Sequence, residues 1–155
     1  MPLKRSLRYQ SLESRRLLAA VDIPDTLSGL PGALISVPVN IDTAADVRGV
    51  EIRVAYDISV LTLDQSRVVA GSVWDSAADT QVTANVDAAN GVVVVFVSSA
   101  AALGSVSGSL VEFGFTIASG AALGSTTVLD LTRAVLNEGQ VSVTPQPQAG
   151  PDPTD

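Results

Sequence analysis

Carboxylates are the side chains of this sequence with the clearest capacity for chemistry. The 155 residues include 16 Asp and Glu but no His and no Cys. A Ser-His-Asp triad, an imidazole base, a thiolate nucleophile and the usual zinc sites are therefore excluded. Two carboxylates would suffice for glycoside hydrolysis, so a small glycosidase or esterase is one hypothesis. Nothing in the sequence singles out one acid from the others, and we predict that the chain is not an enzyme.

Three aspartates in the middle of the chain could suggest a calcium site. The spacing of Asp75, Asp79 and Asp87 fits no EF-hand loop, which takes ligands at positions 1, 3, 5 and 12 around a central Gly. We expect solvated loop carboxylates instead. The glycines form no phosphate-binding loop, because none lies between a strand and a helix with a following Lys. The sequence thus predicts no metal site and no cofactor.

The charge of the chain is unevenly distributed. Residues 1–20 hold five of the nine basic side chains and one of the sixteen acidic ones, so the rest of the chain is strongly acidic. Nucleic acid is not an expected partner, because phosphate binding needs a clustered basic surface. An acidic, Lys-poor composition is typical of secreted or surface proteins. The 46% hydrophobic content is enough to bury the core of one domain.

The basic N-terminal segment has neither a membrane span nor a standard secretory signal. Its longest apolar run, residues 17–21, is shorter than the apolar region of about 7–15 residues in such a signal. No stretch reaches the roughly 20 apolar residues of a spanning helix. We therefore expect no transmembrane segment. A disordered or weakly helical tail is the simplest interpretation of this segment.

A resemblance gives the segment a more specific interpretation. Residues 12–18 are similar to the Leu-Glu-Pro-Arg-x-Leu-Leu segment that opens many surface and exported proteins of planctomycete bacteria, with Ser14 in the place of Pro. The matching residues are Leu12, Glu13, Arg15, Leu17 and Leu18. The resemblance implies a sorting or export role for residues 1–21 and an extracellular or cell-surface location.

Short apolar strands and turn residues alternate along the body of the chain. Gly49–Tyr56 is the clearest strand, with Val and Ile on one face and Glu51 and Arg53 on the other. After the Asn90-Gly91 turn, Val92–Val97 is apolar on both faces, as in a central strand or one with an exposed apolar face. The other expected strands are Leu34–Ile41, the pieces at 61–63 and 68–69, Gln81–Val86, Leu110–Ile117, Thr126–Leu131 and a short piece at 141–143. This pattern predicts an all-β, antiparallel jelly-roll sandwich with little or no helix.

Three segments in order carry a second resemblance. Residues 32–39 look like an opening Gly-x-x-Val-x-Val-Pro-Val strand. Residues 50–61 alternate and end in Tyr-Asp-x-x-Val-Leu, and residues 134–140 end in Asn-Glu-Gly-Gln. In this order, over about residues 32–143, they resemble the cohesin family of β-sandwich modules, which bind dockerin modules.

The resemblance implies about nine strands and one sheet that docks the dockerin. Its strands would be Gly49–Tyr56, Gln81–Val86, Val92–Val97 and Thr126–Leu131. The candidate partner-binding residues on its outer side are Glu51, Arg53, Thr83 and Asn85. Alternation does not decide which side of Val92–Val97 faces outward. In this interpretation any calcium belongs to the dockerin partner.

The end of the chain departs from the family pattern. A final Gly-x-Val-x-Val strand is expected after Asn-Glu-Gly-Gln, yet only Val141–Val143 and a Pro-rich stretch follow. Either an edge is left unpaired and open to another chain, or residues 141–143 replace the strand in short form. The sequence thus divides into a sorting segment at 1–21, a cohesin-like sandwich at 22–143 and a Pro-rich tail or linker at 144–155.

The function expected from these features is that of a non-catalytic interaction module. It would dock a calcium-loaded, dockerin-bearing partner at the cell surface, with polysaccharide-degrading assemblies as a possible setting. One alternative is a carbohydrate-binding module, for which the single Trp, Trp74, could stack on a sugar, although packing at one end of the sandwich is its favoured role. Another alternative is a structural module that self-associates through an open sheet edge.

Overall fold

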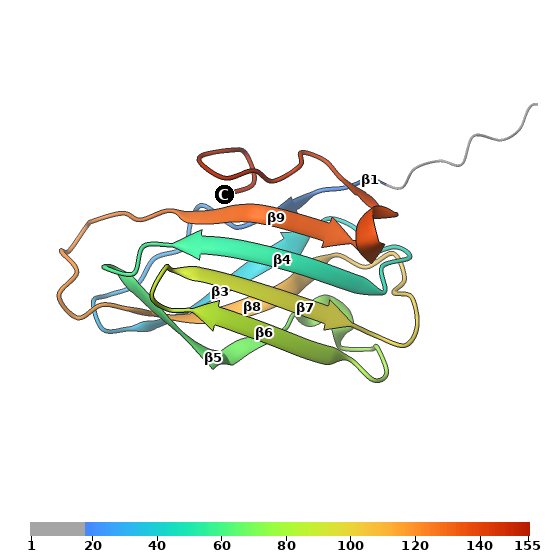
Figure 1. The fold of residues 1–155 in the computed structure, drawn as a ribbon, viewed down its shortest axis with the longest axis horizontal. Helices are drawn as coiled ribbons and strands as arrows, with labels where there is room; N and C mark the ends of the chain where they lie inside the picture. The colour runs from blue at the N-terminus through green and yellow to red at the C-terminus, as the bar shows by residue number, and fades with distance from the viewer. Residues whose placement is uncertain (1–17) are drawn as a thin grey trace, which may run out of the picture.

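The computed structural model describes residues 18–155 as a β-sandwich of two antiparallel four-stranded sheets (Figure 1). One sheet has the strand order β2-β3-β8-β5 and the other β6-β7-β4-β9, while β1 and β10 form a small parallel pair. Four residues of the predicted sorting motif, Leu12, Glu13, Arg15 and Leu17, lie outside the described residues, and Leu18 begins β1. The expected jelly-roll fold class is confirmed.

The strands are β1 (Leu18–Ala19), β2 (Val21–Asp22), β3 (Leu34–Ile41), β4 (Gly49–Tyr56), β5 (Leu61–Ala70), β6 (Gln81–Asp87), β7 (Val92–Ser98), β8 (Gly108–Ile117), β9 (Leu129–Leu136) and β10 (Ser142–Val143). Two single turns of 3-10 helix, η1 (Ser72–Trp74) and η2 (Asn137–Gly139), are the only helical elements among the described residues. None of these described helical turns is long enough or apolar enough to cross a membrane.

The core is built from alternate residues of both sheets. The even-numbered residues of β4 and the odd-numbered residues of β7 are buried. Val54, Val93 and Val95 are completely covered. Each such side chain contributes about 1.5–3 kcal/mol on burial. Tyr56 meets Phe115 of the opposite sheet edge-to-face, with ring centroids 5.1 Å apart. The aromatic rings thus join two sheets whose remaining core side chains are mostly small.

Trp74 is buried at one end of the sandwich. Its indole N–H donates a 2.9 Å hydrogen bond to the carbonyl of Leu110 in β8, and η1 holds it between the two sheets. The expected packing role is confirmed, and this ring is not available for stacking on a sugar.

The strands expected at 34–41, 49–56, 81–86 and 92–97 agree with β3, β4, β6 and β7 to within one residue. Residues 61–70 form one irregular strand instead of two pieces, β8 begins two residues earlier than expected, and β1 and β2 were not expected. The largest difference is at β9. The expected strand Thr126–Leu131 was wrong: β9 begins at Leu129 and runs to Leu136. Residues 126–128 form an exposed loop instead. A bulge at Thr132 breaks the two-residue periodicity, so buried positions in β9 are spaced by three residues at that point, and alternation does not extend past Leu131.

The terminal strands close one end of the sandwich. β10, which lies within the short piece expected at 141–143, pairs in parallel with β1. The Pro-rich residues 144–155 then return along the outer edge of β9 (Figure 1). The Asp155 carboxylate accepts the backbone N–H of Leu131 at 3.0 Å, and the Thr154 carbonyl accepts the N–H of Ile23 at 2.9 Å. This segment therefore bridges the edges of both sheets.

Candidate interaction face

The outward side of the sheet β6-β7-β4-β9 presents two central rows of side chains. In the first row Thr83, Phe96, Glu51 and Val135 lie side by side on β6, β7, β4 and β9. In the second row the order is Asn85, Val94, Arg53 and Arg133. We call these eight residues the outer face. Because they stand on regular, hydrogen-bonded strands, their positions are set before any partner arrives.

All four residues expected from the sequence belong to the outer face. Glu51 and Arg53 project from β4, and Thr83 and Asn85 project from the edge strand β6. Glu51 is half-buried and the other three are exposed. The sheet therefore brings together residues from segments more than 25 positions apart in the chain, while their role in binding stays a prediction.

The apolar centre of the outer face could not be assigned by alternation. β7 reads as apolar on both sides, and the structure turns Val93, Val95 and Val97 inward. Val94 and Phe96 therefore face outward, and Phe96 is 50% exposed. Together with the half-buried Val94, Phe96 gives the outer face an apolar centre.

Arg133 and Val135 were also missed by the sequence reasoning. Strict alternation would place them on the same side as the buried Leu131. The extra residue Thr132 reverses the alternation, and its hydroxyl donates to the carbonyl of Arg53 at 3.3 Å. The bulge thus turns Arg133 and Val135 outward beside β4.

One ion pair crosses the outer face. The Arg133 Nε lies 2.9 Å from a Glu51 carboxylate oxygen, with side chains 50% and 23% exposed. Such a partly exposed pair contributes little stability by itself. The guanidinium of Arg53, which lies directly opposite Arg133 in the strand register, forms no ion pair within the described part of the chain.

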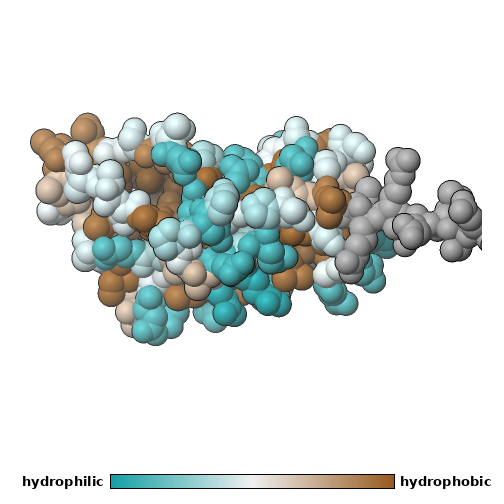
Figure 2. All heavy atoms as spheres, turned by 90° about the horizontal axis from the view of Figure 1, so that it is seen from above, coloured by the Kyte–Doolittle hydropathy of each residue, from teal (hydrophilic) through white to brown (hydrophobic). Residues whose placement is uncertain are grey.

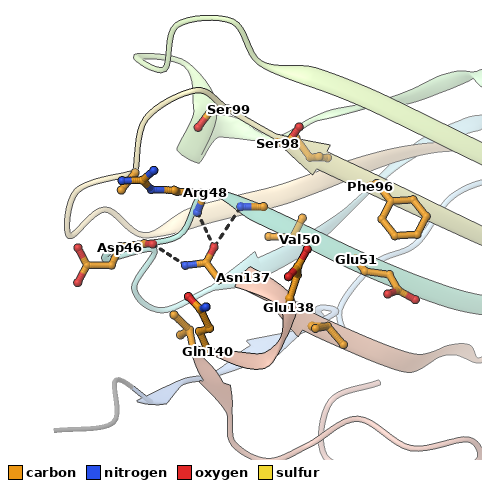
Figure 3. Close-up of a pocket in the computed structure, with 15 residues that line it drawn as sticks. Asp46, Arg48, Val50, Glu51, Phe96, Ser98, Ser99, Asn137, Glu138 and Gln140 are labelled. Atoms are coloured by element: carbon orange, nitrogen blue, oxygen red, sulfur yellow. Dashed lines mark hydrogen bonds between the residues drawn. The ribbon is translucent and has the colours of Figure 1, made fainter. Parts of the chain in front are cut away.

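A hollow of about 1100 Å³ continues the outer face at the end where β4 begins and β7 and β9 end (Figure 3). Asn137 forms its floor: the side-chain oxygen accepts the backbone N–H groups of Arg48 (2.7 Å) and Gly49 (3.2 Å), and the amide donates to the Asp46 carbonyl (2.7 Å). Phe96 and Glu138 also line the hollow. The Asn-Glu-Gly-Gln segment therefore fixes the loop that leads into β4.

Two acidic side chains beside the outer face, Asp87 and Asp130, accept hydrogen bonds from backbone N–H groups. Asp87 ends β6, and hydrogen bonds from the Asn90 side chain and backbone hold the pKa of this carboxyl below its usual range. The three aspartates considered for calcium do not converge: in the described residues no group of three or more acidic side chains is arranged to hold a metal ion.

A second hollow of about 890 Å³ lies at the opposite end of the molecule, between the loops that precede β3 and β9. Apolar side chains gather at the left end of the molecule in Figure 2. Leu30, Leu123 and Val128 are exposed in this region, and Leu123 is 80% exposed. Unlike the outer face, this hollow rests on loops rather than on regular strands.

Comparison with known proteins identifies the family. The family model of the cohesin domain matches residues 19–149. This range includes every strand from β2 to β10 and the Asn-Glu-Gly-Gln segment that ends at Gln140. The chain belongs to the cohesin family. Cohesin domains are non-catalytic interaction modules, and this cohesin has the sheet arrangement described above. Among curated proteins, none matches the chain.

Solved cohesin structures share the fold of this cohesin at low sequence identity. The third cohesin of ScaC from Acetivibrio cellulolyticus, in complex with the ScaB dockerin, is 22% identical with a TM-score of 0.57, and the match covers 73% of this chain and 84% of that one. A non-cellulosomal cohesin from the archaeon Archaeoglobus fulgidus is 19% identical, with a TM-score of 0.59 and coverages of 81% and 85%. The OlpC cohesin of Clostridium thermocellum, in complex with Doc435, is 13% identical, with a TM-score of 0.62 and coverages of 86% and 92%.

Proposed function

We propose that this cohesin is a non-catalytic module that docks a dockerin-bearing protein through its outer face. The observation that carries the proposal is the apolar centre formed by the exposed Phe96 and the half-buried Val94 on a hydrogen-bonded sheet, surrounded by polar and charged side chains. An apolar centre with a polar rim is the usual anatomy of a specific protein interface. The similar cohesins of ScaC and OlpC are each described in complex with a dockerin.

The setting of this interaction is also a proposal. The resemblance of residues 12–18 to an export segment supports an extracellular or cell-surface location, with residues 1–21 serving sorting and 22–143 serving docking. Recruitment of polysaccharide-degrading enzymes is one use that such a module would serve. Self-association through an open edge is less well supported, because β1 pairs with β10 and residues 144–155 cover β9.

The test is a pull-down from the same organism with the full chain as bait. The full chain is needed because β1 supplies the partner of β10. The pull-down is run with calcium and with chelator, since a dockerin folds only with calcium. Two variants accompany the wild type: Phe96→Asp on the outer face, and Val69→Asp on the opposite sheet. These two side chains are matched in exposure, at 50% and 47%.

We expect a captured protein with paired calcium-loop repeats that is lost on chelation and lost with Phe96→Asp, but retained with Val69→Asp. Circular dichroism shows whether each variant is folded. If Phe96→Asp still captures the partner, the docking site lies elsewhere on the molecule. A blank result with folded wild-type bait in both conditions would reject dockerin docking.

A further inference from the structure

Two arginines face each other at the centre of the outer face. Arg53 of β4 and Arg133 of β9 are register partners on adjacent strands. Side chains directly opposite each other have Cβ atoms about 4.5–5.5 Å apart, and like charges in such a pair are destabilising. The bulge at Thr132 creates this pairing, because in an uninterrupted register after Leu131 it is Thr132 that would lie opposite Arg53. The sheet thus places two like-charged side chains opposite each other on its outer side.

The pairing is unusual in a chain so poor in basic residues. Beyond residue 20 the basic side chains are Arg48, Arg53, Arg67 and Arg133, against 15 acidic ones. Two of these four cations are neighbours on the outer face. Only Arg133 has an ion-pair partner, Glu51, in the part of the chain that the structure describes.

Two other carboxylates of this sheet lie one register row from Arg53 without forming an ion pair with it in the described residues. The next row beyond Arg53 holds Asp87 on β6 and Asp130 on β9. Asp87 accepts hydrogen bonds from the turn at Asn90, and Asp130 accepts the backbone N–H of Gly150 at 2.8 Å. Neither carboxylate forms an ion pair with Arg53 within residues 18–155, so no acidic side chain of the described chain occupies this guanidinium.

We infer that Arg53 and Arg133 form an anchor for a carboxylate of the docked partner, so that this cohesin selects a dockerin with an Asp or Glu at the centre of its contact surface. The inference rests on the proposed function of the outer face. A partner that covers Val94 and Phe96 also removes water from the arginine pair, which makes an unpaired cation costly there. A guanidinium can bind a carboxylate through two parallel hydrogen bonds, and two guanidiniums side by side offer several such donors.

The same pair acts against the wrong partners. A dockerin with Lys or Arg at this point would bring a third positive charge to two that already repel each other. Discrimination of this kind comes from repulsion as much as from attraction. The charge of the partner's central residue would then decide which dockerins bind, while the apolar contact with Phe96 supplies affinity without selectivity.

The experiment is a selection from a displayed library of a calcium-loaded dockerin whose surface helix positions are randomised. The baits are the full wild-type chain, Arg53→Glu, Arg67→Glu and Phe96→Asp. Arg67→Glu is the matched control, since this substitution makes the same charge change on the opposite sheet. The Arg67 side chain lies against Gly114 of β8. Arg53→Glu places opposite charges across β4 and β9, so the fold should tolerate it.

We expect wild-type binders to be enriched in Asp or Glu and to bind Arg53→Glu at least about tenfold more weakly, as loss of a desolvated charge pair implies. Arg67→Glu should bind them unchanged, and selection on Arg53→Glu should enrich Lys or Arg. If the binders depend on Phe96 but show no preference for Asp or Glu, docking through the outer face is supported and the arginine anchor is rejected. No binders at all would reject the docking face and the anchor with it.

Acidic polysaccharide is the competing ligand for an arginine pair. Polygalacturonate is therefore tested on the same baits without any dockerin. Retention of polygalacturonate by the wild type and Arg67→Glu but not by Arg53→Glu would assign the pair to sugar carboxylates and overturn the protein anchor. No retention by any bait, together with acidic enrichment in the selection, would support the anchor.

Discussion

At the scale of single residues, Asn137 holds the loop that leads into β4. Its side chain makes three hydrogen bonds with the backbone of residues 46–49, and its own backbone has a φ of 46°, in the left-handed region. Asparagine tolerates this conformation better than most residues. A short side chain thus satisfies three backbone groups and shapes the hollow beside the outer face.

We predict that Asn137→Gly lowers the free energy of unfolding by about 1–3 kcal/mol, because two backbone N–H groups, of which that of Gly49 is half-buried, and one carbonyl lose their partner. Asn137→Ala should cost more, since alanine loses the same bonds and is also strained at positive φ. Urea titration of both variants measures the difference. Equal stability of the glycine variant and the wild type would contradict the role given to the side chain.

A second prediction at this scale concerns acid stability. The Asp57 carboxylate accepts the Ser59 hydroxyl (2.6 Å) and backbone N–H (2.8 Å), and these bonds lower the pKa of Asp57 in the folded chain. A lowered carboxyl pKa stabilises the fold above the unfolded value of about 3.9 and loses that contribution as the pH falls through the folded value. The melting temperature should therefore fall on acidification partly because of this turn.

In Asp57→Asn this titration is absent, so the melting temperature should depend less steeply on pH between about pH 5 and pH 2. Ser59→Ala removes the largest cause of the pKa shift and should reduce the same slope. Melting curves across this range measure the effect. A slope identical to that of the wild type in both variants would show that the turn does not contribute to acid unfolding.

At the scale of elements, β9 is an edge strand that is covered by a Pro-rich segment instead of by another strand. Its inner edge pairs with β4, and its outer edge receives residues 146–155 through Asp155, Gly150 and the Gln146 side chain. An uncovered edge strand exposes N–H and C=O groups to other chains. The Pro-rich segment therefore takes the place of a neighbouring strand without supplying a new edge.

We predict that a chain ending at Pro145 has a lower melting temperature and associates as its concentration rises. Leu131 N–H and the Ala134 carbonyl would then lack their present partners. Calorimetry and light scattering measure both effects. A Gly/Ser segment of equal length in place of residues 146–155 is the control, and it should behave like the shortened chain. If it behaves like the wild type, the specific contacts do not protect β9.

At the scale of the whole molecule, the two ends of the described chain close the sandwich together. β1 pairs with β10, the Thr144 N–H donates to the Ala19 carbonyl at 2.9 Å, and Ile23 donates to Thr154. Ala19, Val21 and Ile23 are all buried. Closure between segments more than 100 residues apart couples both sheets into one cooperative unit.

We predict that a chain starting at residue 21 melts at a lower temperature than one starting at residue 18. The difference reports on β1, which includes the buried Ala19 and pairs with β10, together with Ala20, which exchanges hydrogen bonds with Asp42. Differential scanning calorimetry of the two chains measures it. The variant Ala19→Asp in the full chain should also be destabilised, because it places a charge in the core. Equal melting temperatures of the two shortened chains would show that β10 does not need β1.

The sequence alone determined the fold class and most strand positions. Alternation in β4 reflects burial on one face and is visible residue by residue, while the apolar run of β7 shows a strand without showing its buried side. The ordered cohesin segments also placed Glu51, Arg53, Thr83 and Asn85 on one sheet, where the structure has them. Their partner-binding role is still a prediction.

Only the tertiary structure decided three further features. It turned Phe96 outward, because both sides of β7 are apolar and the opposite sheet alone selects the buried side. It paired Arg53 with Arg133 through a bulge that no local periodicity encodes. It folded residues 144–155 back onto β9, since prolines exclude regular structure but do not say which edge such a segment covers. Each depends on contacts between distant segments, and such contacts arise only once the sheets have packed.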